Sequence, residues 1–356
     1  MAAGPRCDAR QNGAAAAVSG LAGRRRAWRL YQGVLDRLLE DPDLEVAAIT
    51  GTSAGALNAA ALKAGLLAGG AAGARAALDG LWSAIGDVGD LRLTTWFRTA
   101  FPLAALWGDV AAAASPVSAT GLAAQLYSPY AWGDFWRNPL QPIVEDFDFS
   151  KVCAGQGPDL FISATNVRSG KIRVFSRGEI TPDVLLASAC LPTVFQAVTL
   201  TDPATGQPEA YWDGGYTGNP ALFPLYQPHL PADILIVSIN PLRREALPQT
   251  PVEIQDRINE ISFNAALLGE LRAIAFVKRL IAEGRMPAGA MKDLNIHLIA
   301  DDALMNSLGA GSKLKPSPGL LAQLKTAGRA AAEDWLARHR SAVGQGSSVD
   351  LRGLFG

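Results

Sequence analysis

Apolar residues along the chain form short runs separated by helix-spaced patterns. Four runs are typical of buried strands: EVAAIT (45–50), DLFISATNV (159–167), ADILIVSIN (232–240) and LNIHLIA (294–300). Helical spacing occurs at 31–41, and 53–69 predicts a helix of small residues. Strands that alternate with helices predict an α/β fold, with a mostly parallel central sheet in a three-layer α/β/α arrangement.

A long amphipathic helix is predicted for residues 250–284. Thr250 suits the N-cap, Pro251 the first helical position and Glu253 the third, which together form a capping box. Gly284 is a natural residue to end the helix.

The composition changes along the chain and predicts its organisation. Residues 1–18 hold mainly Ala, Gly and polar residues, and we expect them to be disordered. The main domain is expected at 19–300, followed by a helical extension at 301–345. The Gly/Ser-rich end, 346–356, is expected to be a flexible tail.

An aromatic-rich insertion at 86–142 interrupts the main domain. Its poor periodicity predicts a cap or lid rather than part of the central sheet. Residues 96–136 either pack on themselves or face lipid, in which case they would contact a membrane peripherally.

Bulk composition narrows the function classes. The 356 residues include 32 basic and 33 acidic side chains, so the near-neutral charge gives no electrostatic case for nucleic acid. Three cysteines, no convincing signal peptide and no apolar stretch of about 18 residues favour a cytoplasmic protein. Neither metal-ligand spacing nor a P-loop occurs, so no cofactor, metal or calcium requirement is expected. The oligomeric state stays open.

The pentapeptide Gly51-Thr52-Ser53-Ala54-Gly55 lies at the junction of a predicted strand and a predicted helix. A Gly-x-Ser-x-Gly sequence in that context is typical of a nucleophilic serine on a sharp turn. Ser53 is therefore the candidate nucleophile, and it needs a base that accepts its proton.

Histidine is scarce, since the chain has only His229, His297 and His339. By chain order, His297 or His339 fits a Ser–His–Asp triad esterase. The alternative base is Asp213 in YWDGG, at the end of an apolar strand. Gly214 and Gly215 follow it and allow a sharp turn.

The motifs GTSAGALNA (51–59), LASACLPTVFQAV (186–198) and YWDGGYTGNPAL (211–222) resemble those of bacterial patatin-like phospholipases. The resemblance spans roughly 19–300 and implies that family's three-layer fold. It also implies hydrolysis of phospholipids or related acyl esters through an acyl-enzyme. Ser53 would be the nucleophile and Asp213 the base of a dyad without histidine.

The sequence departs from this family in the loop that precedes the first helix. Ala54 supplies one backbone donor for the oxyanion. The family's other donors come from a glycine-rich loop, of which only Gly23 remains, while Arg24, Arg25 and Arg26 stand among its positions. The chain is then either a weakened hydrolase or a patatin-fold interaction protein that has lost activity.

A reading-frame change would also explain the missing glycines. One codon set for residues 22–30, read from the second base, encodes Gln-Gly-Gly-Gly-Ala-His-Gly-Ala-Tyr, which is the family loop. Divergence of the loop and an out-of-frame segment at 19–31 are thus competing interpretations, and the nucleotide sequence of the gene separates them.

Overall fold

The computed structural model describes residues 13–18, 28–91, 129–130, 138–192, 195–238, 242–287, 289–300 and 318–354. Within these ranges eight strands form one sheet, in the order β5-β6-β3-β2-β1-β7-β8, and β4 pairs with β3. The strands are β1 (Gly13–Val18), β2 (Glu45–Thr52), β3 (Asp159–Asn166), β4 (Ile172–Ser176), β5 (Val198–Thr201), β6 (Pro208–Asp213), β7 (Asp233–Ser238) and β8 (Asn295–Ala300). Strands β1, β2, β3, β7 and β8 are parallel, whereas β4 and β6 run antiparallel to β3.

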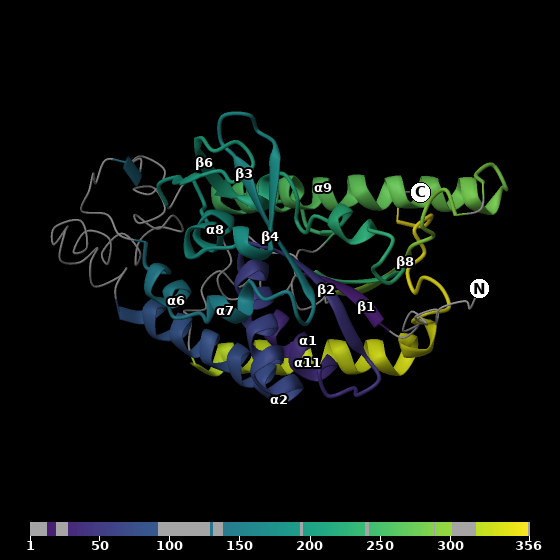
Figure 1. Ribbon diagram of the computed structural model, residues 1–356, viewed down its shortest axis with the longest axis horizontal. Helices are drawn as coiled ribbons and strands as arrows, with labels where there is room; N and C mark the ends of the chain where they lie inside the picture. The colour runs from purple at the N-terminus through teal and green to yellow at the C-terminus, as the bar shows by residue number, and fades with distance from the viewer. Residues whose placement is uncertain are drawn as a thin grey trace, which may run out of the picture.

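Helices cover both faces of this sheet (Figure 1). The α-helices are α1 (Trp28–Leu38), α2 (Ala54–Leu91), α6 (Gln141–Glu145), α7 (Phe149–Val152), α8 (Pro182–Ser188), α9 (Pro251–Ala282) and α11 (Pro318–His339). Short 3₁₀ turns form η2 (Arg177–Glu179), η3 (Gly214–Tyr216), η4 (Phe223–Tyr226) and η5 (Arg340–Ala342). Helix α9 lies on one face, and α1, α2 and α11 lie on the other, so the predicted three-layer α/β/α class is confirmed (Figure 1).

Two apolar clusters fill the space between the layers. One joins α1 and α2 to the sheet through residues such as Val34, Leu57 and Ile162. The other joins α9 to β7 through residues such as Leu267 and Ile236. The buried apolar area on each face is the main favourable contribution to stability.

The start of α9 follows the predicted capping box. Thr250 Oγ1 accepts from the Glu253 backbone N–H at 3.2 Å, and a Glu253 carboxylate oxygen accepts from the Thr250 N–H at 3.1 Å. At the other end Gly284 adopts φ 65°, which suits a residue that stops a helix.

The prediction that residues 1–18 are disordered was wrong for residues 13–18. They form β1, in the middle of the sheet, with β2 on one side and β7 on the other. Alanine has low strand propensity, and such a short run of small residues gives little local signal. Parallel pairing on both sides fixes the strand instead.

The predicted flexible tail is also wrong for residues 346–354. Ser347 Oγ accepts from the Ile296 N–H at 3.0 Å, and the Ser348 N–H donates to the Ile296 carbonyl at 3.0 Å. Leu351 is buried in the apolar cluster below α9. The tail therefore adds hydrogen bonds to the exposed edge of β8, which local composition does not reveal.

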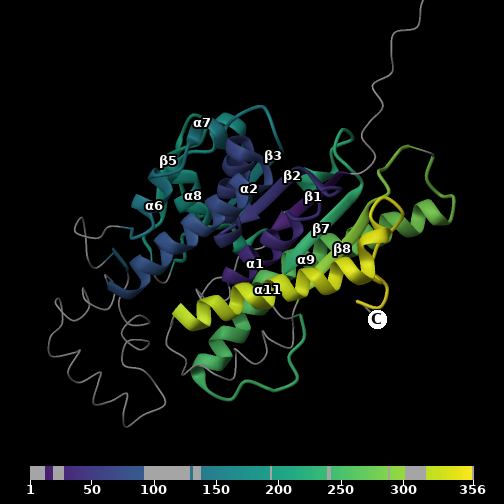
Figure 2. The same ribbon diagram turned by 90° about the horizontal axis from the view of Figure 1, so that it is seen from below.

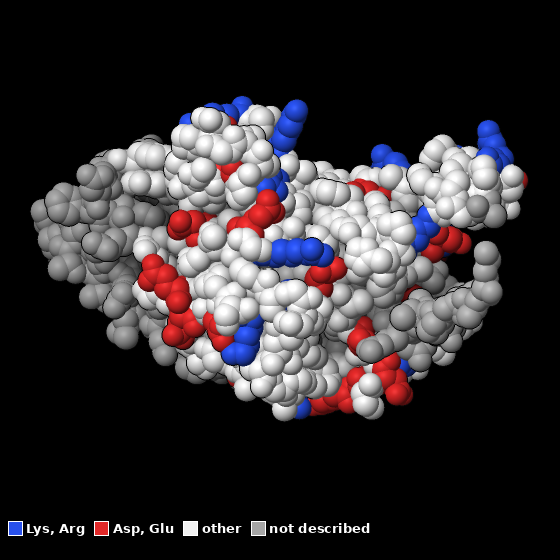
Figure 3. Space-filling view, in the orientation of Figure 1, with Lys and Arg blue, Asp and Glu red and all other residues white. Residues whose placement is uncertain are grey.

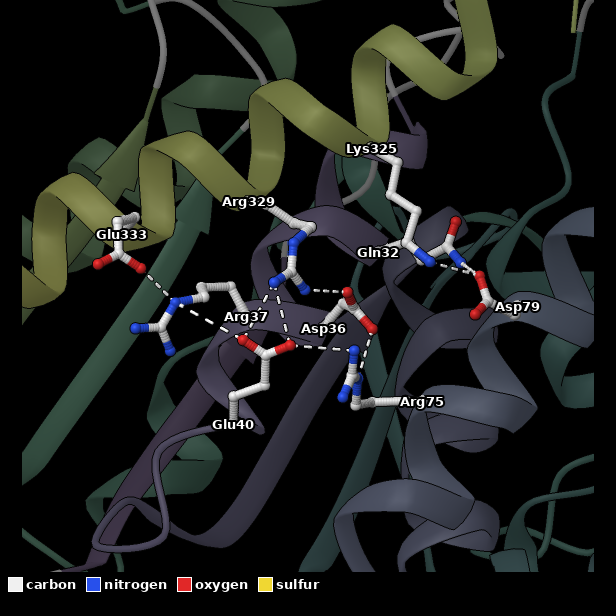
Figure 4. A network of polar contacts seen from close by, with 9 residues as sticks. All are labelled: Gln32, Asp36, Arg37, Glu40, Arg75, Asp79, Lys325, Arg329 and Glu333. Atoms are coloured by element: carbon white, nitrogen blue, oxygen red, sulfur yellow. Dashed lines mark hydrogen bonds and ion pairs between the residues drawn. The ribbon is translucent and has the colours of Figure 1, made fainter.

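Helix α11 in the predicted C-terminal extension packs along α1 (Figure 2). A polar network holds it there: Arg329 contacts Asp36 and Glu40, and Arg75 of α2 binds the same two carboxylates (Figure 4). Burial tends to raise the pKa of Asp36, but the hydrogen bonds from Arg75 and Arg329 hold it below its usual value. This network ties the C-terminal helix to the main domain.

Acidic and basic side chains are interspersed on the face drawn in Figure 3. No helix in the described part of the chain is long and apolar enough to cross a membrane. The predicted lid residues 96–136 fall outside the described residues, except for Pro129 and Tyr130, which contact Gln196 and Ala197.

Candidate active site

Strands β2 and β6 lie end to end along one edge of β3. On that edge Ser163 is registered with Thr52, the last residue of β2. The next residue of β3, Ala164, is registered with Asp213, the last residue of β6. The other edge of β3 pairs with β4 at both positions. Strand pairing alone therefore brings the turn after β2 next to Asp213, although 160 residues separate Ser53 and Asp213 in the sequence.

Ser53 occupies this turn in a strained conformation. Its φ is 56°, in the left-handed region that non-glycine residues seldom adopt and that costs roughly 1 kcal/mol or more. Helix α2 starts at the next residue, so the backbone reverses from strand to helix at Ser53. A Cβ atom at Gly51 would lie 2.5 Å from the Gly55 backbone carbonyl oxygen, which explains the first glycine of the motif. These features are those of a nucleophile elbow.

Ser188, at the end of α8, holds the turn at Ser53 in place through two hydrogen bonds. Its hydroxyl accepts from the Ser53 backbone N–H at 3.0 Å and donates to the Ser163 carbonyl at 2.8 Å. One buried side chain thus links the turn to β3. Sequence reasoning did not single out Ser188, because a serine at a helix end has no distinctive local pattern.

The backbone of Asp213 is held on both sides. Its N–H donates to the Cys190 carbonyl at 2.7 Å, and its carbonyl accepts from Thr165 Oγ1 at 2.8 Å. A Cβ atom at Gly214 would lie 2.2 Å from the Ser163 carbonyl oxygen, so the turn after Asp213 requires the glycine there. These contacts fix the position from which the carboxyl group projects.

The carboxyl group of Asp213 is fully buried, and only one of its two oxygens accepts a hydrogen bond. Oδ1 accepts from the Gly215 N–H at 2.8 Å, whereas Oδ2 has no hydrogen-bond partner among the described residues. Burial raises the pKa of Asp213 to about 7, and the nearby Ser53 hydroxyl and the Gly215 N–H offset part of that rise. The group therefore changes charge near neutral pH, as suits a general base.

Ser53 and Asp213 are thus brought together in a dry site. The Ser53 hydroxyl is close enough to lower the pKa of Asp213, yet it does not complete a hydrogen bond to Oδ2. Catalytic hydrogen bonds are often loose before substrate binds and tighten in the reacting complex.

The structure places the three histidines away from this pair. His297 lies on β8, three strands from β2, which is about 14 Å at the usual strand spacing. Its Nε2 faces Asp233 Oδ1 and its Nδ1 faces Ser348 Oγ, both at 3.0 Å.

The other two lie near the amino ends of the strands. His229 contacts Asp159, the first residue of β3, at 3.3 Å. His339 precedes Arg340, which pairs with Asp41 at 2.7 Å, shortly before β2 begins. None of the three is placed to accept a proton from Ser53.

The oxyanion donors are described in part. Ala54 is buried at the first position of α2, where the N–H group has no carbonyl partner within the helix. Gly23 and Arg24–Arg26 lie outside the described residues. Strand β1 ends at Val18, which is registered with Gly51. The chain therefore leaves β1 at the carboxyl end of the parallel strands, where Ser53 also lies.

No group of three or more His, Cys, Asp or Glu side chains within the described ranges is arranged to hold a metal ion. Cys190, whose carbonyl binds Asp213, is a buried free thiol, and burial raises its pKa to about 12.

A mostly parallel sheet between two layers of helices, with a serine in the left-handed region at a strand-to-helix turn, defines the chain as an α/β protein. A model of the family described as patatin-like phospholipase matches residues 29–226, more than half of the chain. The chain belongs to the patatin-like phospholipase family, which supports a lipid acyl hydrolase that acts on lipid esters.

Among solved structures, VipD from Legionella pneumophila is similar, with a TM-score of 0.42 and 13% identity. The alignment covers 92% of this chain and 67% of the VipD chain. A search of curated proteins returned no match.

Proposed function

We propose that this chain hydrolyses phospholipids or related acyl esters with a Ser53–Asp213 dyad. The observation that carries the proposal is the buried Asp213 carboxyl, whose Oδ2 is without a hydrogen-bond partner beside Ser53. Family membership supports the substrate class. No cofactor takes part in this mechanism.

In the first half-reaction Ser53 Oγ attacks the acyl carbonyl carbon, and the hydroxyl proton passes to Asp213. The Ala54 N–H faces the developing oxyanion, where a preorganised donor lowers the barrier. The carbon–oxygen bond to the leaving alcohol then breaks, and that oxygen takes the proton from Asp213. In the second half-reaction water attacks the acyl-enzyme, Asp213 accepts the water proton, and the proton returns to Ser53 as the free acid leaves.

Hydrolysis of a p-nitrophenyl acyl ester by the purified chain tests the dyad. We expect Ser53→Ala to abolish turnover and Asp213→Asn to lower it by about 10²–10⁴. His297→Ala should keep the wild-type rate once the rate is corrected for the fraction of folded protein. Circular dichroism and thermal unfolding serve as folding controls. Full activity of Asp213→Asn would reject the dyad, and loss of activity in a folded His297→Ala variant would favour the triad.

The alternative is an interaction protein whose oxyanion loop is degenerate, and the three consecutive arginines at 24–26 favour it. Removing one oxyanion donor costs on the order of 10²–10³ in rate. A fluorophosphonate probe separates the two proposals, because it labels Ser53 only where the nucleophile is activated. Sequencing the gene across residues 19–31 then decides between a divergent loop and a changed reading frame.

We also propose, from the aromatic content of residues 96–136, that this segment contacts membranes peripherally. Flotation with liposomes of the intact chain and of a chain lacking the segment tests it. Equal flotation of the two chains would reject this contact.

A further inference from the structure

Helix α9 is apolar on two opposite faces. Phe263, Leu267 and Leu271 are buried against the sheet. On the outer face Ile254, Ile258, Ile261 and Phe276 are 44%, 51%, 54% and 52% exposed. A helix that is apolar all round is normally buried on all sides. The outer face of α9 therefore has the composition of a surface that meets a second apolar phase.

The exposed apolar residues line up along one side of the helix, with Arg272 on the same line. At 3.6 residues per turn, positions 254, 258, 261, 265, 272 and 276 lie within about 40° of a common line. Ala265, also exposed, continues this line after Ile261, and Gly269 and Arg272 lie between Ala265 and Phe276. From Ile254 to Phe276 the stripe is about 33 Å long at 1.5 Å per residue. We call residues 254, 258, 261, 265, 272 and 276 the outer stripe.

The charges around the outer stripe are arranged asymmetrically. Exposed Arg272 lies within it. The Arg279 guanidinium lies 5.3 Å from the centroid of the Phe276 ring, and its Nε lies 4.0 Å from Glu283 just after the end of the helix. The acidic side chains in the middle of the helix turn inward, where Glu260 pairs with Arg244 and Glu270 accepts from Leu222 and Tyr226. Arginines beside exposed isoleucines and a phenylalanine suit a helix that lies in the headgroup region of an anionic bilayer.

The outer stripe belongs to the same helix as the wall of the candidate site. Phe263 packs against Tyr216 of η3 with a ring-centroid separation of 5.0 Å. A Cβ atom at Gly215 would lie 1.9 Å from the Phe263 ring, so α9 touches the turn that carries Asp213. Docking through α9 would therefore hold the dyad close to the membrane that contains its substrate.

We propose that the outer stripe of α9 docks on the surface of anionic lipid bilayers. This proposal rests on the proposed function in one respect, namely that docking would bring the dyad close to its lipid substrate. The docking itself is independent of catalysis, and a second copy of the chain is the competing occupant.

Vesicle flotation with the full chain tests the docking. The vesicles contain phosphatidylcholine alone or phosphatidylcholine with phosphatidylglycerol. We expect the wild-type chain to prefer the mixed vesicles, and Ile258→Ser/Ile261→Ser to lose roughly tenfold or more in binding. Arg272→Gln/Arg279→Gln should lose roughly fivefold per arginine on the mixed vesicles only. Met291→Ser is the matched control, since Met291 is 50% exposed outside α9.

Several outcomes would overturn the docking. They are no binding by the wild-type chain, equal binding by the double isoleucine variant with its unfolding midpoint unchanged, or equal loss in Met291→Ser. A wild-type dimer that the isoleucine substitutions convert to a monomer, with no change in vesicle binding, would assign the stripe to self-association. Ser53→Ala separates the two proposals: unchanged flotation with no hydrolysis supports docking whether or not the dyad is correct.

Discussion

Two buried aspartates lie at opposite ends of the sheet, and their surroundings differ. Asp233, at the start of β7, has three groups around Oδ1: His297 Nε2 at 3.0 Å, the Gly344 N–H at 2.8 Å and Asn295 Nδ2 at 3.3 Å. Asp213, at the end of β6, has a single N–H at Oδ1 and none at Oδ2. Both side chains are buried, Asp213 more deeply, and Asp233 has more hydrogen-bond donors around it.

The donors set opposite pKa directions for the two carboxyl groups. Burial favours the neutral form of each, but the hydrogen bonds from His297, Gly344 and Asn295 hold the pKa of Asp233 below its usual value. Desolvation prevails at Asp213 and raises its pKa to about 7. The comparison teaches that a satisfied buried aspartate stabilises the fold, whereas an unsatisfied one is available for chemistry.

The largest expected effect distinguishes the two aspartates by activity. Asp213→Asn removes the proposed proton acceptor but keeps the shape of the side chain, so ester hydrolysis should fall by about 10²–10⁴. Asp233→Asn should leave kcat/KM per folded molecule within about twofold, because it lies outside the reacting groups. Equal losses in the two variants would remove the functional distinction between them.

The pH dependence of stability should have opposite signs at the two sites. With its pKa at about 7, Asp213 holds its proton in the folded chain up to about that pH, whereas the unfolded carboxyl loses it near its usual pKa of 3.8. Its contribution is therefore fully present below pH 3.8 and is lost as pH rises toward about 7.

The rise in the pKa of Asp213 from 3.8 to about 7 corresponds to a loss of about 4 kcal/mol in the free energy of unfolding across this pH range. Asp213→Asn should accordingly unfold at higher denaturant concentration than wild type at pH 8, and the gain should vanish near pH 4. Hydrolysis by the wild-type chain should rise through pH about 7 as Asp213 ionises. Denaturant titrations and a pH–rate profile measure the two, and a gain that is equal at both pH values would contradict the assignment.

A moderate effect is expected from truncating the satisfied aspartate. Asp233→Ala leaves His297 Nε2, the Gly344 N–H and Asn295 Nδ2 without their acceptor. It should lower the free energy of unfolding by about 2–4 kcal/mol at pH 7. The pKa of Asp233 is lowered in the folded chain. In the wild-type chain the stabilisation by this carboxylate should therefore be lost as the pH falls through the lowered pKa of Asp233. A variant as stable as wild type would show that these hydrogen bonds contribute little.

The smallest expected effect concerns Ser188, which holds the turn at Ser53 in place. Ser188→Ala removes the acceptor of the Ser53 N–H and the donor to the Ser163 carbonyl. We expect kcat to fall about tenfold with KM unchanged, since loss of these hydrogen bonds would displace the nucleophile and raise the barrier by about 1.4 kcal/mol. Ser188→Thr, which keeps the hydroxyl, should restore most of the rate. A change confined to KM or to stability would exclude a positioning role.

Sequence reasoning anticipated features that depend on local pattern. The long apolar runs became β2, β3, β7 and β8, and the capping box became the start of α9, because these signals act over a few residues. The pairing of β1 and of the tail was missed, because it depends on neighbours distant in the sequence. Ser53 and Asp213 were predicted as site residues from their motifs, but the unpartnered Oδ2 that distinguishes Asp213 depends on its three-dimensional surroundings.

Pairing with strand β3 sets the relative position of Ser53 and Asp213, the proposed dyad. Adjacent residues, Ser163 and Ala164, fix the end of β2 and the end of β6 on one edge. A slip of β6 by one residue would move Asp213 by about 3.3 Å and turn its carboxyl to the other face of the sheet. Such a misaligned chain would keep most of its core and still lack a proton acceptor. Regain of hydrolysis during refolding would therefore report correct alignment of β6, which collapse or helix content does not detect.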